Sequence, residues 1–379
     1  MKKFFRPESV AFLAIWVFLI LCGRVNLFRD PGTFWHTVVG RQILASHHFP
    51  SADAFSFTFH GQPWIAHEWL LECVMGLVYG GFGFDGLLIL TAAALAGFYT
   101  WIFSRLLRSG LSLPLASLLL ALVLAASAHH FHVRPHVLSI IFLGLTFAWL
   151  CDFEAGRKSL GRLFWLWPLF IIWTNSHGAV LGGLGTIGLT LGGWTLWRLL
   201  RQDSPIKSTR GMLLLGLLLL GCLLTILLNP YGLELPKTWL ALVNSPVVPQ
   251  VIQEHVSLLK EPGKNWATLA LGLCFLACLA GALPRRPRVT WLLPVVWLIL
   301  ACSRVRHAPL FAVTAVLALA EFFPQVRWAR RLGDRGSMIF RLEPAGAPRP
   351  PRNFKAWLVP GAAVLLTVLV SLASINLTG

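Results

Sequence analysis

Basic side chains gather in two short segments that join apolar runs of the chain. Residues 129–136 read His-His-Phe-His-Val-Arg-Pro-His, and residues 304–307 read Arg-Val-Arg-His. Ionisable groups are costly to hold at the edge of a membrane, so a functional site is the first hypothesis for them. Arginine donates two parallel hydrogen bonds to phosphate. The two segments therefore predict an anion-binding site, with these ligands: Arg134, His136, Arg304, Arg306 and His307.

Three of these histidines are also candidate metal ligands. His129, His130 and His132 lie within four residues, and imidazole is a common ligand of divalent metals. No His-Glu-x-x-His or comparable metal signature is present. A divalent metal ion therefore stays open as a cofactor, and no cofactor is certain.

Three acids also lie in segments that join apolar runs, where an ionisable residue is a candidate for a functional site. Asp30 opens the segment Asp-Pro-Gly-Thr-Phe-Trp-His36, and the adjacent pair His67-Glu68 supplies a second acid beside an imidazole. Glu254 is a third acid, in the sequence Gln-Glu-His. Asp30, His67 and Glu68 are therefore candidate site residues, and His36 and Glu254 are candidate substrate ligands.

Two polar turns could also face a ligand. One reads Asn175-Ser-His177-Gly, and the other reads Asn229-Pro-Tyr-Gly. Asn175, His177 and Asn229 are therefore candidate substrate ligands. Asparagine also caps helix ends and turns, and the sequence leaves that alternative open for both Asn175 and Asn229.

The elements that position these residues are apolar helices. Of 379 residues, 56% are hydrophobic and 12% are charged, and the mean hydropathy is +0.70. Runs close to the ~20 residues needed to cross a bilayer must be helical, because lipid cannot satisfy backbone polar groups. An all-α, polytopic integral membrane protein with about eleven spans is predicted. The spans are 9–27, 86–104, 111–128, 136–151, 162–175, 178–198, 211–228, 266–283, 289–303, 307–324 and 356–375.

Charge counting favours this number of spans. With the N-terminus inside, 23 of the 32 Lys and Arg residues lie on the cytoplasmic side, as the positive-inside rule requires. If residues 67–82 crossed as well, 23 would lie outside, so we expect that segment to lie along the interface. All twelve histidines then fall on the outside. The topology places the N-terminus in the cytoplasm, the C-terminus outside, and the polar chemistry on the extracytoplasmic face of a bacterial inner membrane.

The topology divides the chain into three parts. Residues 1–325 form the transmembrane domain, 326–355 a basic cytoplasmic loop and 356–379 a C-terminal transmembrane helix. The long first outside loop, 28–85, contains an amphipathic stretch beginning near Trp35 and the segment 67–82. Both are expected to be helices on the membrane surface.

Several function classes are disfavoured. The net charge of +17 is explained by cytoplasmic loops, and no basic stripe interleaved with exposed aromatics suggests nucleic acid. The seven cysteines show no spacing typical of a disulfide framework. No P-loop or dinucleotide-binding glycine pattern is present, which disfavours a nucleotide-sugar donor.

The order of these features resembles the GT-C glycosyltransferases. The motifs at residues 30–40, 64–69, 175–178 and 229–232 are most similar to those of the RgtA/B/C/D-like (glycosyltransferase family 39-like) bacterial proteins. The resemblance covers roughly residues 10–325. The resemblance implies an inverting transfer of a sugar from a polyprenyl-phosphate donor to an extracytoplasmic glycan, lipid or protein. It assigns the general base to Asp30, makes His67 and Glu68 the further catalytic candidates, and assigns stabilisation of the leaving phosphate to the cationic groups. The partners implied are the donor lipid, the acceptor and membrane lipids.

The sequence departs from this family at one point. Many members carry a second acid beside the first, but Pro31 and Gly32 occupy those positions here, which makes Glu68 the candidate substitute. A transporter or flippase of lipid-linked sugars, a polymerase- or ligase-like enzyme and a non-catalytic GT-C-like scaffold are the alternatives. A transporter is disfavoured by the lack of an internal repeat, and a ligase-like enzyme by the early position of the largest loop.

Overall fold

The structure is a computed structural model that describes residues 6–247, 250, 253–282, 287–342 and 354–373. Within these ranges the chain is helical and contains no β-strand, as the apolar runs predict. A single isolated β-bridge joins Ala52 to Pro63, in the loop between the two predicted surface helices.

The helices follow the apolar runs closely. In chain order they are α1 (Pro7–Leu21), α2 (Arg24–Leu27), α3 (Gly32–Ser46), α4 (Trp69–Arg108), α5 (Leu113–Ser127), η1 (Ala128–His130), α6 (His136–Glu154), α7 (Leu160–Leu163), α8 (Leu166–Thr174), α9 (Val180–Leu199), α10 (Thr209–Leu224), η2 (Thr225–Leu227), α11 (Glu234–Asn244), η3 (Gln253–His255), η4 (Leu258–Lys260), α13 (Trp266–Ala282), α14 (Val289–Ser303), η5 (Val305–His307), α15 (Ala308–Phe322), η6 (Phe323–Gln325), α16 (Arg327–Asp334), η7 (Phe354–Trp357) and α17 (Leu358–Leu372).

By length and composition, six described helical stretches could cross a membrane: α4, α5 with η1, α6, α10 with η2, α15 with its flanking 3₁₀ turns, and η7 with α17. Four shorter apolar stretches are α1, α7 with α8, α13 and α14. These ten stretches and α9, which has 20 residues, overlap all eleven predicted spans. The helices fit a multi-pass membrane protein, and the number of crossings stays a prediction.

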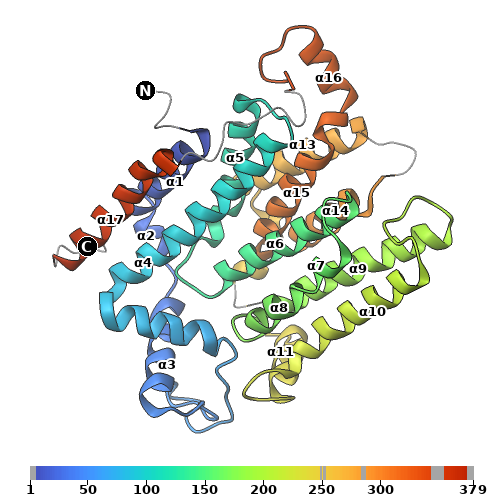
Figure 1. Cartoon of the computed structure of the whole chain (residues 1–379). Helices are drawn as coiled ribbons and strands as arrows, with labels where there is room; N and C mark the ends of the chain where they lie inside the picture. Colours follow the sequence, from blue (N-terminus) through green and yellow to red (C-terminus); the bar gives the residue numbers. More distant parts are fainter. Residues whose placement is uncertain (1–5, 248–249, 251–252, 283–286, 343–353, 374–379) are drawn as a thin grey trace.

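Helix α15 is the centre of the bundle. It is buried along nearly its whole length and contacts α4, α5, α6, α13 and α14. Helices α10 and α17, at opposite edges of the bundle (Figure 1), instead expose many leucines. In a membrane protein such faces are covered by lipid tails, so the exposed leucines on these two helices are consistent with the predicted environment.

The long first loop contains the two helices expected there. Helix α3 covers the amphipathic stretch, and α4 begins at Trp69 with an arm that turns sharply away from the rest of the helix (Figure 1). The bend is at Gly83, whose φ of 60° and ψ of −153° suit glycine far better than other residues. The arm therefore corresponds to the segment predicted not to cross; its position at a membrane surface stays a prediction.

Helix α3 and the α4 arm cross with their backbones in contact. A Cβ atom added to Gly40 would lie 1.7 Å from the carbonyl oxygen of Glu72, and one added to Gly76 would lie 2.7 Å from the backbone nitrogen of Arg41. Only glycine permits such an approach. The crossing fixes which residues of the two helices face each other.

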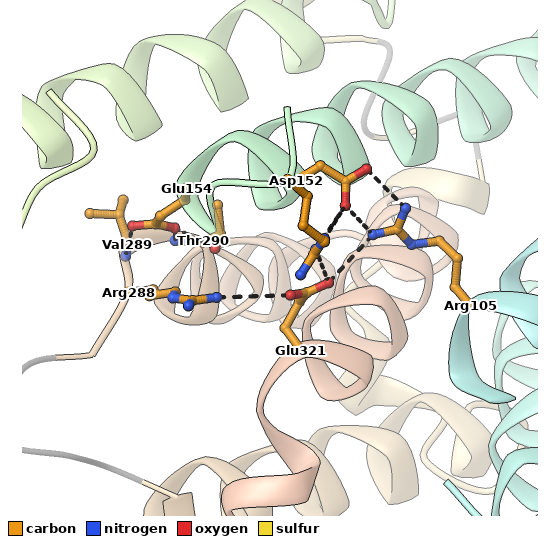
Figure 2. A network of polar contacts seen from close by, with 8 residues as sticks. Arg105, Asp152, Glu154, Arg288, Val289, Thr290 and Glu321 are labelled. Atoms are coloured by element: carbon orange, nitrogen blue, oxygen red, sulfur yellow. Dashed lines mark hydrogen bonds and ion pairs between the residues drawn. The ribbon is translucent and has the colours of Figure 1, made fainter. Parts of the chain in front are cut away.

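An ionic network joins the helices at the end of the bundle that carries α16 (Figures 1 and 2). Arg105 of α4 bonds Asp152 of α6 at 2.8 Å, and Arg157 bonds both Asp152 at 2.7 Å and Glu321 of α15 at 2.6 Å. Arg288 completes it at 3.9 Å from Glu321. Alternating charges thus hold α4, α6 and α15 together.

Glu154 extends this network to α14 (Figure 2). Its carboxylate accepts hydrogen bonds from the backbone N–H groups of Val289 and Thr290, at 2.8 and 3.0 Å, and from the Thr290 hydroxyl. A carboxylate in this position satisfies the free N–H groups at the start of a helix. We call the side chains of Arg105, Asp152, Glu154, Arg157, Arg288 and Glu321 the ionic network.

The basic segment 326–355 contains a helix that the sequence did not predict. Within its described part, α16 packs Trp328 against Phe323 and Phe340. Residues 343–353 of that segment, and 374–375 at the end of the last predicted span, lie outside the described residues.

Candidate functional site

A cavity of about 370 Å³ opens at the other end of the bundle. It lies where α6, α9, α14 and α15 begin or end, and it is flanked by α11 and η3. Its polar lining consists of His67, Glu68, His130, Arg134, His136, Ser139, His177, Glu254, His255, Arg304, Arg306 and His307. Residues from segments far apart in the chain meet here, and ten of the predicted site residues are among them.

Glu68 stands at the centre of a buried cluster. Three imidazole Nε2 atoms lie around its carboxylate: those of His36 at 3.4 Å, His177 at 3.5 Å and His67 at 3.6 Å. The residue is 5% exposed, lines the cavity, and its Oε2 atom has no hydrogen-bond partner. Burial alone would raise the pKa of this carboxyl, but the surrounding histidines hold the pKa far below its usual value. Glu68 is therefore a carboxylate at neutral pH.

The histidine next to Glu68 in the chain shares this carboxylate. Burial alone would lower the pKa of His67, but the Glu68 carboxylate beside it raises the pKa above its usual value. His67 thus retains its proton to higher pH than a free histidine and helps to neutralise Glu68.

His177 is held in one tautomer. Its Nδ1 atom accepts hydrogen bonds from the backbone N–H of Ala179 at 3.1 Å and from the hydroxyl of Ser139 at 3.0 Å. That hydroxyl accepts in turn from the indole N–H of Trp173 at 2.8 Å, so its hydrogen is free to point to His177. The proton of neutral His177 is consequently on Nε2, facing Glu68. Burial lowers the pKa of His177 to about 4, which keeps the ring neutral.

Asp30 forms an ion pair with Arg134. Its carboxylate accepts a hydrogen bond from the Arg134 guanidinium at 2.7 Å and from the backbone N–H of Gly32 at 2.7 Å. Burial would raise the pKa of Asp30, but the Arg134 charge and the Gly32 hydrogen bond hold the pKa below its usual value. Asp30 does not line the cavity, whereas Arg134 does. The geometry favours Glu68 over Asp30 as the base that reaches a ligand.

The second cationic segment is joined to η3. The backbone N–H of Val305 bonds the carbonyl of Val256 at 2.9 Å, and Arg306 donates to Nε2 of His255 at 2.7 Å. Because a guanidinium only donates, neutral His255 carries its proton on Nδ1, which is buried without a partner. Burial and the nearby arginine charges lower the pKa of His255. Among the described residues, no carboxylate lies within ion-pairing distance of Arg304 or Arg306.

The three candidate metal ligands do not converge. His129 bonds the carbonyl of Lys264, His132 bonds the carbonyl of Asn26, and His130 is buried with both ring nitrogens unpartnered. No group of three or more histidine, cysteine or acidic residues suited to a metal occurs in the described part of the chain. The described structure therefore does not bring His129, His130 and His132 together as one ligand set, and a role of any of them in metal binding stays a prediction.

The two asparagines hold turns instead of facing the cavity. Asn175 accepts from the indole of Trp69 and donates to the carbonyls of Ile171 and Leu228, all at 2.8 Å. Asn229 makes equivalent bonds within its own turn, accepting from Tyr231 N–H. Neither lines the cavity. The structure thus supports the capping alternative for both.

Part of the cavity lining is apolar. It includes Ile140, Leu181, Trp297 and Leu310, and Trp239 of α11. The edges of the two indoles approach α9 and the turn before it at two glycines: a Cβ atom on Gly178 would lie 3.0 Å from Trp239, and one on Gly182 would lie 2.9 Å from Trp297. The indole N–H of Trp239 is buried and unpartnered.

Sequence reasoning missed Glu72, Ser139, His255 and both indoles. Glu72 follows Glu68 by four residues, the spacing of one helix face, and this was the available signal. Trp297 lies in the middle of a predicted span and Trp239 in an outside loop, among 17 tryptophans in the chain, so nothing in the sequence distinguished them.

Comparison of the chain with protein-family models, with curated proteins and with solved structures found no match. The functional argument therefore depends on the geometry of this site.

Proposed function

We propose that this protein is a membrane glycosyltransferase with a GT-C-like, eleven-span scaffold, which transfers a sugar from a polyprenyl-phosphate donor to an extracytoplasmic acceptor with inversion. One observation carries the proposal: a buried carboxylate, two arginines that have no carboxylate partner among the described residues, and several apolar side chains all line the same cavity. A lipid phosphate that bears a sugar has the matching parts, namely an anion, a hydroxylated ring and an apolar tail.

The cationic groups suit the leaving phosphate. When the bond between the anomeric carbon and the phosphate oxygen breaks, its electron pair and the developing negative charge go to the phosphate. Arg134, Arg304 and Arg306 line the cavity and would stabilise that charge. Asp30 contributes by holding Arg134 in position through their 2.7 Å contact.

Glu68 suits the acceptor side of the reaction. Its ionised carboxylate would take the proton of the acceptor hydroxyl while the hydroxyl oxygen attacks the anomeric carbon. Inversion follows if the attacking oxygen and the leaving phosphate lie on opposite faces of the sugar. This assignment moves the base from Asp30, which the family resemblance implies, to Glu68.

The apolar residues of the cavity lining would contact the lipid tail. Ile140, Leu181 and Leu310 line the cavity and belong to α6, α9 and α15, which are apolar helices of the bundle. A tail between these helices would leave the phosphate among the arginines at the bundle end.

Mass spectrometry of bound lipids tests the proposal. The protein would be purified in mild detergent from a membrane containing polyprenyl phosphates, as wild type and as Arg304→Ala/Arg306→Ala. Arg327→Ala/Arg330→Ala, which removes two exposed arginines from α16 at the other end, is the matched control. We expect polyprenyl-phosphate species on the wild type and the control and at least a tenfold loss on the cavity variant. Equal lipid occupancy in all three proteins would contradict the proposal.

A further inference from the structure

Behind Glu68, on the side away from the cavity, His36 lies between two buried carboxylates. Its Nδ1 atom is 2.8 Å from Oε1 of Glu72, and its Nε2 atom is 3.4 Å from Oε2 of Glu68. Glu72 is 2% exposed and His36 is 6% exposed, and neither lines the cavity. The three side chains form a line that leads from the cavity into the protein.

The hydrogen-bonding capacity of this line is only partly used. A carboxylate only accepts, so the 2.8 Å contact places a proton on Nδ1 of His36. Neutral His36 then presents the lone pair of Nε2 to Glu68. The Oε2 atoms of both glutamates are buried without a hydrogen-bond partner. Such atoms are uncommon in a folded protein and call for an explanation.

We propose that Glu68, His36 and Glu72 form a proton relay, in which a proton taken up by Glu68 from a substrate hydroxyl passes through His36 to Glu72. The relay makes His36 and Glu72 positioning and proton-accepting residues for the reaction at Glu68. It rests on the proposed function for the origin of the proton, but the coupling of the three groups does not require a substrate.

The transfer balances at each atom. The O–H bond of the substrate breaks and its proton binds Glu68. Glu68 passes a proton to Nε2 of His36, which becomes an imidazolium held between two carboxylates. The Nδ1 proton then moves to Oε1 of Glu72, leaving neutral His36 with its proton on Nε2, ionised Glu68 and protonated Glu72. The 3.4 Å gap between His36 and Glu68 must shorten to hydrogen-bond length, as commonly happens when a substrate binds.

A second proton acceptor would allow Glu68 to release the proton that it takes from the substrate. The histidines around Glu68 lower its pKa, so this carboxylate holds a proton poorly. A base of this kind is more effective when the proton is removed from it. His177 does not compete for the proton, because its Nδ1 atom accepts from Ala179 and Ser139 and its Nε2 atom already carries hydrogen.

The crossing of α3 and the α4 arm positions the residues of the relay. His36 lies one turn before Gly40 on α3, and Glu72 lies one turn before Gly76 on the α4 arm. These two glycines are where the backbones touch. The close approach therefore brings an imidazole and a carboxylate from the two helices within hydrogen-bonding distance.

Infrared difference spectroscopy during a pH titration tests the coupling without any substrate. The carboxylic-acid C=O absorption of Glu68 is identified by its loss in Glu68→Gln. His67 and His177 also face Glu68, so every variant retains both. We expect Glu72→Gln to shift the Glu68 midpoint by about one pH unit or more, since coupled sites titrate as a pair. Glu154→Gln, in the ionic network, should leave it unchanged.

A double-mutant cycle separates relay from simple proximity. In His36→Gln, which keeps a polar side chain but cannot carry a proton from one atom to the other, adding Glu72→Gln should shift the Glu68 midpoint by less than about a third of the shift seen with His36 present. An equal shift in both backgrounds, or no shift on Glu72→Gln, would overturn the relay.

Transfer activity supplies a second arm. Glu72→Gln is expected to lower turnover about tenfold to a hundredfold without weakening donor binding, and Glu72→Asp to recover part of the loss. Unchanged turnover in Glu72→Gln would overturn the relay even if coupling were seen. A wild type that shows the coupling but transfers no sugar from any polyprenyl-phosphate donor would instead contradict the proposed function.

Discussion

The two ends of the bundle both concentrate charge, but they satisfy it differently. In the ionic network, acids and arginines alternate at 2.6–3.9 Å, and Glu154 accepts from two backbone N–H groups. Among the described residues, none of its buried side-chain atoms lacks a partner. Around the cavity, Glu68, Glu72, His130, Trp239 and His255 all have buried atoms without partners.

This difference separates a structural role from a functional one. A polar group that is buried and satisfied contributes to a unique packing of helices. A polar group that is buried and unsatisfied costs free energy, and such costs are tolerated where a ligand completes the contacts. The following predictions test that contrast, in order of decreasing effect.

Glu321→Gln should damage stability most. It removes the buried acid that Arg157, Arg105 and Arg288 share, and leaves three neighbouring guanidinium groups with one counter-charge fewer. We expect a loss of about 3 kcal/mol in unfolding free energy, the lower end for broken buried ion pairs, because Arg157 and Arg288 are partly exposed. Unfolding by titration with a denaturing detergent measures it, and folded Glu321→Gln protein should still bind donor lipid. A loss below about 1 kcal/mol would show that the network does not stabilise the bundle.

Gly40→Ala should separate α3 from the α4 arm. The added Cβ would collide with the carbonyl of Glu72, so we expect a loss of about 3 kcal/mol, at the upper end of overpacking costs. The shift would also move His36 away from Glu72. Gly80→Ala on the same arm, with open space around it, is the control and should change stability by less than about 1 kcal/mol. Equal effects of the two substitutions would contradict the described crossing.

Acid should destabilise the cavity end. Burial lowers the pKa of His177 from 6.5 to about 4, so the unfolded chain binds more protons between these values. Stability is then lost as pH falls from about 6.5 to 4, by up to about 3 kcal/mol from this group.

Other groups at this end modify the acid response. The depressed pKa values of Glu68 and Asp30 continue the loss at lower pH, whereas the raised pKa of His67 opposes it. His177→Gln should flatten the pH dependence of the unfolding temperature between pH 6.5 and 4. The same slope in wild type and variant would exclude His177 as its source.

Arg306→Gln should have the smallest effect on stability. Arg306 has no carboxylate partner within ion-pairing distance in the described chain, so its loss removes a cost as well as a contact. We expect the unfolding free energy to change by about 1 kcal/mol or less in either direction, while donor binding weakens. A large loss of stability would place Arg306 with the structural residues and weaken the contrast between the two ends.

The sequence predicted some of these features well and others not at all. Apolar runs predicted where the helices lie, because the hydrophobicity of a segment is a local signal. Ten of the residues named as site candidates line one cavity, whereas the membrane face on which that cavity lies stays a prediction. Their partners were not predictable, since the Asp30–Arg134 and His36–Glu72 contacts depend on how helices cross. The role of Asp30 differs for the same reason: its position in the chain suggests a base, but its neighbour in space is Arg134.

The central claim is best tested by comparing one buried carboxylate from each end. Glu68→Gln and Glu154→Gln would be reconstituted in vesicles with polyprenyl-phosphate-linked sugars, and the release of polyprenyl phosphate would be followed by mass spectrometry. We expect Glu68→Gln to lower release by a factor of about 10²–10⁴ with donor still bound, and folded Glu154→Gln to retain it. Full release by Glu68→Gln, or an equal loss in both variants, would contradict the assignment of the cavity as the reaction site.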